Sequence, residues 1–325
     1  MGFIDSMLSG YGQICFNDNT LSGLLFLGAC MVASPQQGVS GLVAVLVSTA
    51  ASYGLGVPRA QLRLGLYSYN AALAGMGLAL FAFDGRGITV GGIFYAALLG
   101  LLCVPLTAAS FRILSIWKIP PLALPYCLSL AILVPAAPRF AALGAAVSAG
   151  SPGAAAPASG GASAALLEYA NAAANGFAEI VWQHNAVSGL MVLAGIFIAS
   201  RIDGLSAVCG VCAATLFGRL LGLPQGDFGA GVLGYNAALL MIVLFGRGYA
   251  ASRPCFFFAL CMALLTAPML SFLSVAFMPF GIPVGAFPYT ICAFMALAAK
   301  DGLKKLHWIN PAEWGVPETI RTNTV

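Results

Sequence analysis

Acceptor groups paired with large aromatic rings occur in two related stretches of this chain, residues 10–24 and 176–190. Gln13 in the first stretch corresponds to Glu179 in the second, and Phe16 corresponds to Trp182, each at an offset of 166 residues. Amide and carboxylate oxygens can accept hydrogen bonds from the N–H groups of a small solute, and a ring three residues further along would share their helix face. These pairs would suit the two mouths of a narrow path. A solvated glutamate at a membrane surface is the alternative interpretation.

The same offset aligns a second block of aromatic and branched side chains. Tyr69 and Leu73 lie in a Tyr-Asn-Ala-Ala-Leu run that recurs at Tyr235 and Leu239. Together with the two aromatic residues of the first block, they could form apolar walls of a slot for a planar solute. Ordinary core packing, or an aromatic belt at the membrane surface, is the alternative.

A third block, Ile-Pro-x-x-Ala-x-Pro-Tyr, occurs at residues 119–126 and again 163 positions later at residues 282–289. Three blocks in the same order, twice, indicate an internal duplication. We predict a first repeat over residues 1–135 and a second over residues 166–300. An Ala/Gly/Ser/Pro-rich linker over residues 136–165 would join them, and residues 301–325 would form a tail.

The composition places these repeats in a membrane. The chain is 60% hydrophobic and only 7% charged, whereas about a quarter of the residues in a soluble domain are charged. We therefore predict an all-α, multi-pass protein of the cell (inner or plasma) membrane, in contact with lipid. Basic residues gather in the tail and are scarce in the linker, which places the two on opposite sides with both termini cytoplasmic. An odd number of spans per half, about five, follows, and the halves are then inverted relative to each other.

Short apolar segments interrupted by Gly or Pro occupy matching positions in both halves, around Tyr69 and Tyr235 and around Pro125 and Pro288. Helices that stop inside a membrane leave backbone groups unpaired at their ends, and such elements commonly build the solute site of inverted repeats. Free carbonyl groups could replace the water around a neutral solute that is rich in N–H donors. Two proline-kinked helices packed against neighbours would produce the same pattern.

No pattern in the sequence indicates an enzyme, a metal site, a cofactor or a nucleic-acid partner. A phosphate-binding lysine loop, a His-Glu-x-x-His motif and a Ser/His/Asp grouping are missing, and His184 and His307 are isolated, with His184 expected to face water. Cys209 and Cys212 have the spacing of a redox pair, but in an apolar run they read as small helix residues.

The three blocks resemble the urea transporter family, over nearly the whole chain. The resemblance rests on Gly-Gln-x-x-Phe-x-x-Asn-x-x-Ser-Gly at residues 12–23, on the aromatic-Asn-x-x-Leu block, and on the Leu-Pro-x-x-Thr-x-Pro-Phe signature, once per half. It implies an inverted duplication of five spans plus a half-membrane helix, a homotrimer with a pore in each protomer, and passive permeation of urea. By position, Gln13 and Glu179 would lie at the mouths of the pore. The slots would be formed by Phe16, Tyr69, Leu73, Trp182, Tyr235 and Leu239.

This chain departs from the family signature at its threonine, which is Ala123 in the first half and Ala286 in the second. Two hydroxyl groups are thereby lost from what the resemblance implies is the narrowest zone. Leaving a desolvated polar group without its hydrogen bond costs about 1–3 kcal/mol. Our hypothesis is that the hydroxyl groups of Tyr69 and Tyr235, which stand where the family commonly has phenylalanine, supply the missing oxygens. The signature phenylalanine is likewise replaced by tyrosine, at residues 126 and 289.

Three other functions stay open at this point. The pore could be adapted to another small neutral solute, such as a short amide, a substituted urea or ammonia. A coupled transporter could use Glu179 as a proton or cation site. A membrane scaffold without transport would make Gln13 and Glu179 matter for stability alone.

Overall fold

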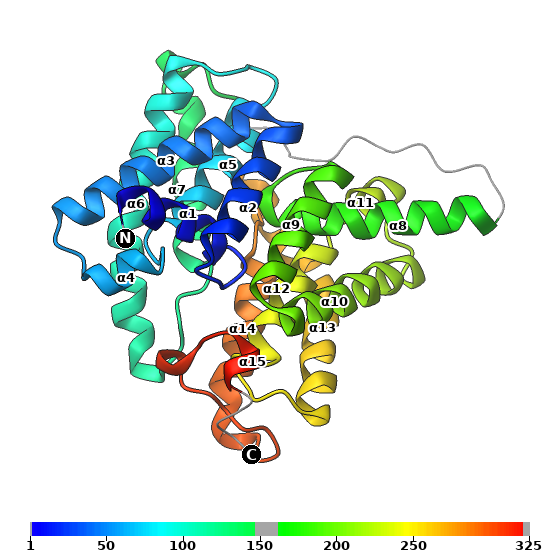
Figure 1. Cartoon of the computed structure of the whole chain (residues 1–325). Coiled ribbons are helices and arrows are strands. Elements are labelled where there is room, and N and C mark those ends of the chain that lie inside the picture. The colour runs from blue at the N-terminus through cyan, green and yellow to red at the C-terminus, as the bar shows by residue number, and fades with distance from the viewer. Residues whose placement is uncertain (1, 147–161, 321–325) are drawn as a thin grey trace. The chain divides into compact units, whose positions relative to one another are not determined.

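Helices make up the regular structure of the chain, which a computed structural model describes over residues 2–146 and 162–320 (Figure 1). The all-α prediction is confirmed for these residues, where the only extended pairings are two isolated bridges. The helices of the first half are α1 (Phe3–Gln13), α2 (Thr20–Ala33), α3 (Pro35–Gly54), α4 (Arg59–Arg63), α5 (Tyr69–Phe83), α6 (Val90–Leu114) and α7 (Leu124–Ala136). Those of the second half are α8 (Ala162–Ala178), α9 (Ala186–Ala199), α10 (Arg201–Leu220), α11 (Gln225–Ala230), α12 (Gly234–Leu244), α13 (Arg253–Phe277), α14 (Phe287–Ala298) and α15 (Pro317–Ile320).

The two halves repeat in local structure as well as in sequence. Helices α2, α3 and α4 begin 166 positions before α9, α10 and α11, and α7 begins 163 positions before α14. The side chain of Asn19 accepts hydrogen bonds from the first turn of α2, as that of Asn185 does for α9. Ser34 and Ser200 cap α3 and α10 in the same way. These caps satisfy N–H groups that a helix cannot pair internally, which is why the same polar residues recur at the same places.

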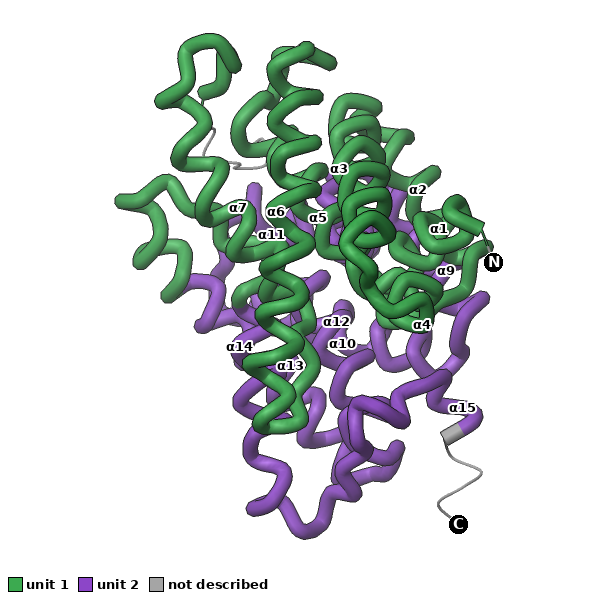
Figure 2. The backbone as a smooth tube through the Cα atoms, turned by 90° about the vertical axis from the view of Figure 1, so that its left-hand side faces the viewer, with its two compact units in different colours: residues 1–150, 272–287 green, residues 151–271, 288–325 purple. Residues whose placement is uncertain are grey.

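The chain divides into two compact units that do not coincide with the two repeats (Figure 2). One unit contains the first half together with residues 272–287, and the other contains residues up to 271 of the second half together with residues from 288 onward. The end of α13 and the segment before α14 therefore belong with the first half. The repeat boundaries at 135, 165 and 300 stay predictions, and residues 147–161 of the predicted linker lie outside the described residues.

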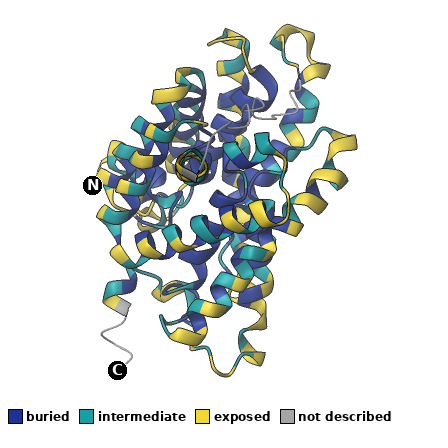
Figure 3. Ribbon diagram, turned by 90° about the vertical axis from the view of Figure 1, so that its right-hand side faces the viewer, coloured by how far each residue is buried: buried dark blue, intermediate teal, exposed yellow. Residues whose placement is uncertain are grey.

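Within each unit one apolar helix is fully enclosed. Every residue of α5 is buried in the first unit, and so is every residue of α12 in the second. Buried residues are dark blue in Figure 3. Helix α5 packs on α3, α6 and α7, and α12 packs on α8 and α10. Because these two helices are buried on every side, each is the central element of its unit. Both predicted slot pairs, Tyr69 with Leu73 and Tyr235 with Leu239, lie on these central helices.

Several helices have the length and composition of membrane spans. Among the described residues, three qualify alone: Val90–Trp117, Arg201–Leu220 and Arg253–Phe280. A fourth span would combine Ser163–Val181 with Ala186–Ala199, which meet at a bend of 71°. The helices Thr20–Ala33, Tyr69–Phe83, Leu124–Arg139 and Gly234–Leu244 are apolar but shorter. The number of spans in each half therefore stays a prediction.

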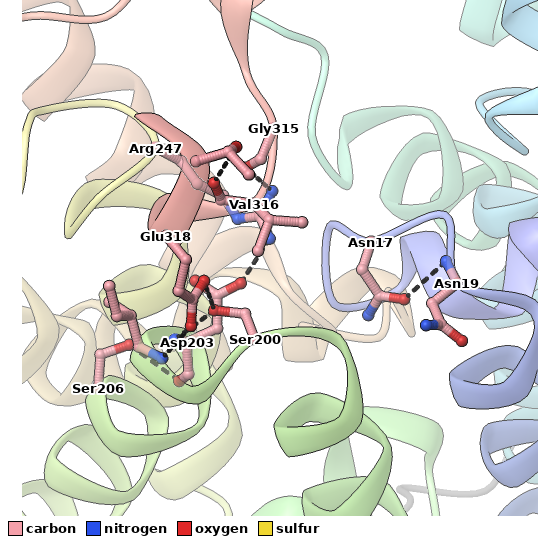
Figure 4. A network of polar contacts seen from close by, with 11 residues as sticks. Asn17, Asn19, Ser200, Asp203, Ser206, Arg247, Gly315, Val316 and Glu318 are labelled. Atoms are coloured by element: carbon pink, nitrogen blue, oxygen red, sulfur yellow. Dashed lines mark hydrogen bonds and ion pairs between the residues drawn. The ribbon is translucent and has the colours of Figure 1, made fainter. Parts of the chain in front are cut away.

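The C-terminal segment packs against the second unit through a polar network at the N-terminus of α10 (Figure 4). The Arg247 guanidinium donates to the carbonyl oxygen of Gly315 at 2.9 Å and forms a buried ion pair with Asp203 at 2.5 Å. The Glu318 carboxylate accepts hydrogen bonds from the backbone N–H of Ile202 at 3.0 Å and from the Ser200 hydroxyl at 2.9 Å. A carboxylate is favoured at a helix N-terminus because unpaired N–H groups and the helix dipole both attract it.

These contacts lower the pKa of the Glu318 carboxyl. Burial raises that pKa, but hydrogen bonds from the backbone of Ile202, of Glu318 itself and of Arg201, and from the Ser200 side chain, outweigh burial and hold it below its ordinary value. The ionised form of Glu318 is thus the form that fastens the tail to α10. In the sequence the tail is recognisable only as a basic segment, because its composition does not indicate that it packs on α10.

Candidate functional site

Gln13 and Phe16 do not share a helix face, because α1 ends at Gln13. The chain turns directly afterwards, and Phe16 has a left-handed backbone with φ of 61°. Trp182, its counterpart, has φ of 60° at the end of a short 3-10 turn that contains Glu179. The prediction that each acceptor shares a helix face with the ring three residues later is therefore wrong. A positive φ is uncommon for an aromatic residue, and its occurrence at both equivalent positions indicates that the surrounding structure imposes it.

One of the two glycines shared by these stretches, Gly23 in the first and Gly189 in the second, lets neighbouring helices approach closely. A Cβ atom at Gly23 would lie 1.9 Å from the carbonyl oxygen of Leu8, and one at Gly189 would lie 2.0 Å from that of Ala174. No side chain can occupy either place, because the atom in the way belongs to the backbone. The glycines thus bring α2 against α1 and α9 against α8, and so fix the turns that carry Phe16 and Trp182.

Tyr69 and Asn70 tie the start of α5 to the segment that precedes α7. The Tyr69 hydroxyl donates to the carbonyl oxygen of Leu122. The Asn70 side-chain oxygen accepts from the backbone N–H of Tyr126 at 3.2 Å, in the first turn of α7. The residue that precedes this helix, Ala123, cannot cap it, since alanine has no polar side chain. Asn70 therefore supplies the cap from another helix.

The second unit contains the same arrangement. The Asn236 side-chain oxygen accepts from the backbone N–H of Tyr289 at 3.1 Å, in the first turn of α14. Our reading of the sequence assigned no role to either asparagine. The signal was present, since the Asn is one of the few polar residues that recur in the second block. Its recurrence reflects the need of each short helix for an acceptor at its buried start.

A second contact within the first unit joins the start of α7 to the segment that precedes α14. The backbone N–H of Ala286, the residue before α14, donates to the Tyr126 hydroxyl oxygen at 2.7 Å. Both residues are buried. Tyr126 thus places a side-chain oxygen beside one of the two alanines that replace the signature threonine. In the sequence this tyrosine is only a departure from the family pattern, and its contact was not predictable from it.

Glu179 is buried and is paired with His184. The Nδ1 atom of the histidine contacts one carboxylate oxygen, while the imidazole stays about one-third exposed. The expectation that His184 is isolated is therefore wrong, because the turn after α8 returns the chain to the glutamate. Burial also argues against the interpretation of Glu179 as a solvated surface group. The pair places a carboxylate and an ionisable imidazole at one location of the second unit.

The structure distributes the predicted site residues between the two units. The first unit holds Gln13, Phe16, Tyr69, Leu73, Ala123 and Ala286, and the second holds Glu179, Trp182, Tyr235 and Leu239. Tyr69 and Leu73 are one helical turn apart on α5, as Tyr235 and Leu239 are on α12, so each pair shares a face. That these residues contact a solute stays a prediction.

Comparison with known proteins agrees with these features. The family described as "Urea transporter" matches residues 4–301 of this chain. "Urea transporter 1" of Ovis aries is 26% identical over 301 residues, which are 92% of this chain and 78% of the sheep protein. "Urea transporter 1" of Mus musculus is 28% identical over 265 residues, which are 82% of this chain and 68% of the mouse protein.

Proposed function

Since this chain belongs to the urea transporter family, we propose that it lets urea cross a membrane passively, through a narrow channel-like path. The observation that carries this proposal is the family match over residues 4–301, nearly the whole chain. The chain is accordingly a multi-pass membrane protein of a transport family and not an enzyme. Selectivity in a pore for neutral solutes depends on its width and on the hydrogen-bonding groups along it.

The short helices α7 and α14 supply the central part of the proposed path. Each begins after an irregular segment that contains a residue with positive φ, Leu122 in one half and Gly285 in the other. Irregular backbone at membrane depth is tolerated where it lines a cavity or is buried in protein. Carbonyl and hydroxyl oxygens at these starts would accept the N–H groups of urea. The apolar faces of α5 and α12 would keep the planar molecule flat.

Gln13 and Glu179 would form the polar mouths at opposite ends of the path. Both offer acceptor oxygens to urea N–H groups as the solute loses its water. The contact with His184 supports a role for Glu179 beyond stability, because it orients the carboxylate in a buried place. In this arrangement the pore belongs to one protomer of a homotrimer in the cell membrane. The repeats are inverted and both termini are cytoplasmic, as the basic tail supports.

Urea flux into proteoliposomes, followed by stopped-flow light scattering, tests the proposal. The purified chain should give fast urea entry that does not change with an imposed proton gradient, against vesicles without protein as the control. Acetamide, methylurea and ammonia are compared in the same vesicles. Slow urea entry with fast entry of another solute would refute urea as the substrate. No flux of any of the four would refute the channel.

A proton-coupled transporter is the second candidate, and the buried Glu179–His184 pair favours it. Two ionisable groups in contact could exchange a proton with one side of the membrane during transport. Such coupling predicts saturable urea flux that rises with an inward proton gradient and loses this dependence in His184→Ala. Flux independent of the gradient in both proteins would exclude this mechanism.

A further inference from the structure

The hydroxyl group of Tyr126 is a buried polar group at the start of the short helix α7. It lies 2.7 Å from the backbone nitrogen of Ala286 and accepts its N–H. Tyr126 comes from the first turn of α7 and Ala286 directly precedes α14, so this hydroxyl connects the start of α7 to the segment before α14. Its exposed fraction, 2%, is like that of Ala286 and Ala123, at 2% and 1%.

Two candidate sources for the oxygens missing at the alanines can now be compared. The Tyr69 hydroxyl, our original candidate, donates to Leu122 and lies at the backbone before α7. Only the Tyr126 hydroxyl is hydrogen-bonded to the main chain of one of the alanines themselves. A threonine at position 286 would carry its hydroxyl two bonds from its own Cα, close to this same N–H group. The Tyr126 oxygen therefore stands near the place where the threonine oxygen is lost.

We infer that Tyr126 is a further specificity-determining residue of the path, whose hydroxyl supplies at Ala286 the side-chain oxygen that alanine cannot. The inference deepens the proposed function and rests on it. A phenolic hydroxyl combines one donor with acceptor capacity for more than one hydrogen bond, so it can hold the Ala286 N–H and also meet an N–H group of urea. The N–H bond fixes the oxygen in position, which a flexible side chain would not achieve.

The first test removes the hydroxyl group of Tyr126 and keeps its aromatic ring. Tyr126→Phe in the full-length protein should lower urea permeability about fivefold, the change that one net hydrogen bond of about 1 kcal/mol corresponds to at room temperature. Tyr95→Phe is the matched control, because Tyr95 is a buried tyrosine of the same unit whose hydroxyl donates to the carbonyl oxygen of Leu133. It should stay within twofold of wild type.

The second test returns the oxygen by another route. Ala286→Thr in the Tyr126→Phe background should restore urea permeability to within twofold of wild type, which recovery of fold alone would not explain. Ala286→Thr alone should leave permeability within twofold, because Tyr126 already supplies the oxygen. This single variant keeps the test decisive if Tyr126→Phe fails to fold.

Three results would overturn the inference. They are unchanged urea permeability in Tyr126→Phe, no recovery in a folded double variant, and a severalfold gain in Ala286→Thr alone. A gain in Ala286→Thr alone would mean that the wild-type path lacks a side-chain oxygen at position 286. If wild-type vesicles pass none of urea, acetamide, methylurea and ammonia, the proposed function has failed and the inference falls with it. If they conduct and Tyr126→Phe behaves like Tyr95→Phe, the inference alone has failed.

Discussion

Removing the asparagine that caps α7 should destabilise the protein and reduce its transport. Asn70→Ala takes away the side-chain oxygen that accepts the Tyr126 N–H at 3.2 Å. That N–H lies in the buried first turn of α7 and cannot find water. An orphaned buried donor costs about 1–3 kcal/mol. The second contact of Asn70, its amide nitrogen to the Leu122 carbonyl, is 3.5 Å long and adds little.

The equivalent substitution in the second half should cost less. Asn236→Ala orphans the Tyr289 N–H, whose hydrogen bond is 3.1 Å long. The Asn236 amide nitrogen, however, is buried and has no hydrogen-bond partner among the described residues, so the wild-type protein already bears a penalty that the alanine removes. We therefore expect Asn70→Ala to be the more destabilising of the two by up to about 1 kcal/mol.

Thermal unfolding of the full-length protein in detergent and urea flux in proteoliposomes are the two assays. Asn310→Ala is the control, because Asn310 caps an exposed short turn of the tail. Both core variants should unfold at lower temperature than this control, with Asn70→Ala lowest, and both should conduct urea severalfold more slowly. If Asn70→Ala unfolds at the same temperature as the control and conducts urea as fast as wild type, the capping role is refuted. A larger loss in Asn236→Ala would refute the argument from the unpaired amide.

Three further predictions concern packing and the tail. Gly23→Ala should prevent correct folding, because its Cβ atom would lie 1.9 Å from the Leu8 carbonyl oxygen. Gly54→Ala is the control and should fold normally, because a Cβ atom there has no neighbour within 4 Å. The yield of monodisperse protein checks both expectations. Arg247→Ala should lower the free energy of unfolding by about 3–5 kcal/mol because it leaves the buried Asp203 carboxylate without its counter-ion, and Asp203→Asn in the same chain should recover part of the loss. The stabilisation from Glu318, whose pKa is lowered, is present above the ordinary value of 4.5 and is lost as the pH falls through the lowered value. Limited proteolysis of the tail should accordingly accelerate in wild type once the pH has fallen below 4.5 and the carboxylate becomes protonated. Glu318→Gln should show fast proteolysis already at about pH 7, with little further change on acidification.

The matched positions in the two halves were predictable because each repeat must solve the same local problem. The offset of 166 residues aligns Asn19 with Asn185 and Ser34 with Ser200 in the sequence, and all four side chains cap helices. Cap geometry depends on a few neighbouring residues, so a short motif carries it. The placement of Tyr69 with Leu73 on one helix face follows from helical spacing in the same way.

The position of Phe16 was predicted wrongly because helical spacing does not reveal where a helix ends. Spacing of three residues after Gln13 indicates a shared face only if the helix continues, and here the chain turns with φ of 61° at Phe16. An aromatic residue has no intrinsic preference for that conformation. The contact of Gly23 with the Leu8 carbonyl oxygen and the packing of α2 on α1 impose the turn, and both depend on residues brought together by the fold.

Composition and repeated motifs were enough to predict a helical membrane protein of the urea transporter family, because both are read directly from the order of the residues. Three pairings follow from the fold instead: Asn70 caps α7, His184 contacts Glu179, and the Tyr126 hydroxyl accepts the Ala286 N–H. Tyr126 and Ala286 are separated by 160 residues, and no spacing rule connects them. Buried polar groups must find partners wherever packing offers them, so these pairings are a property of the folded chain.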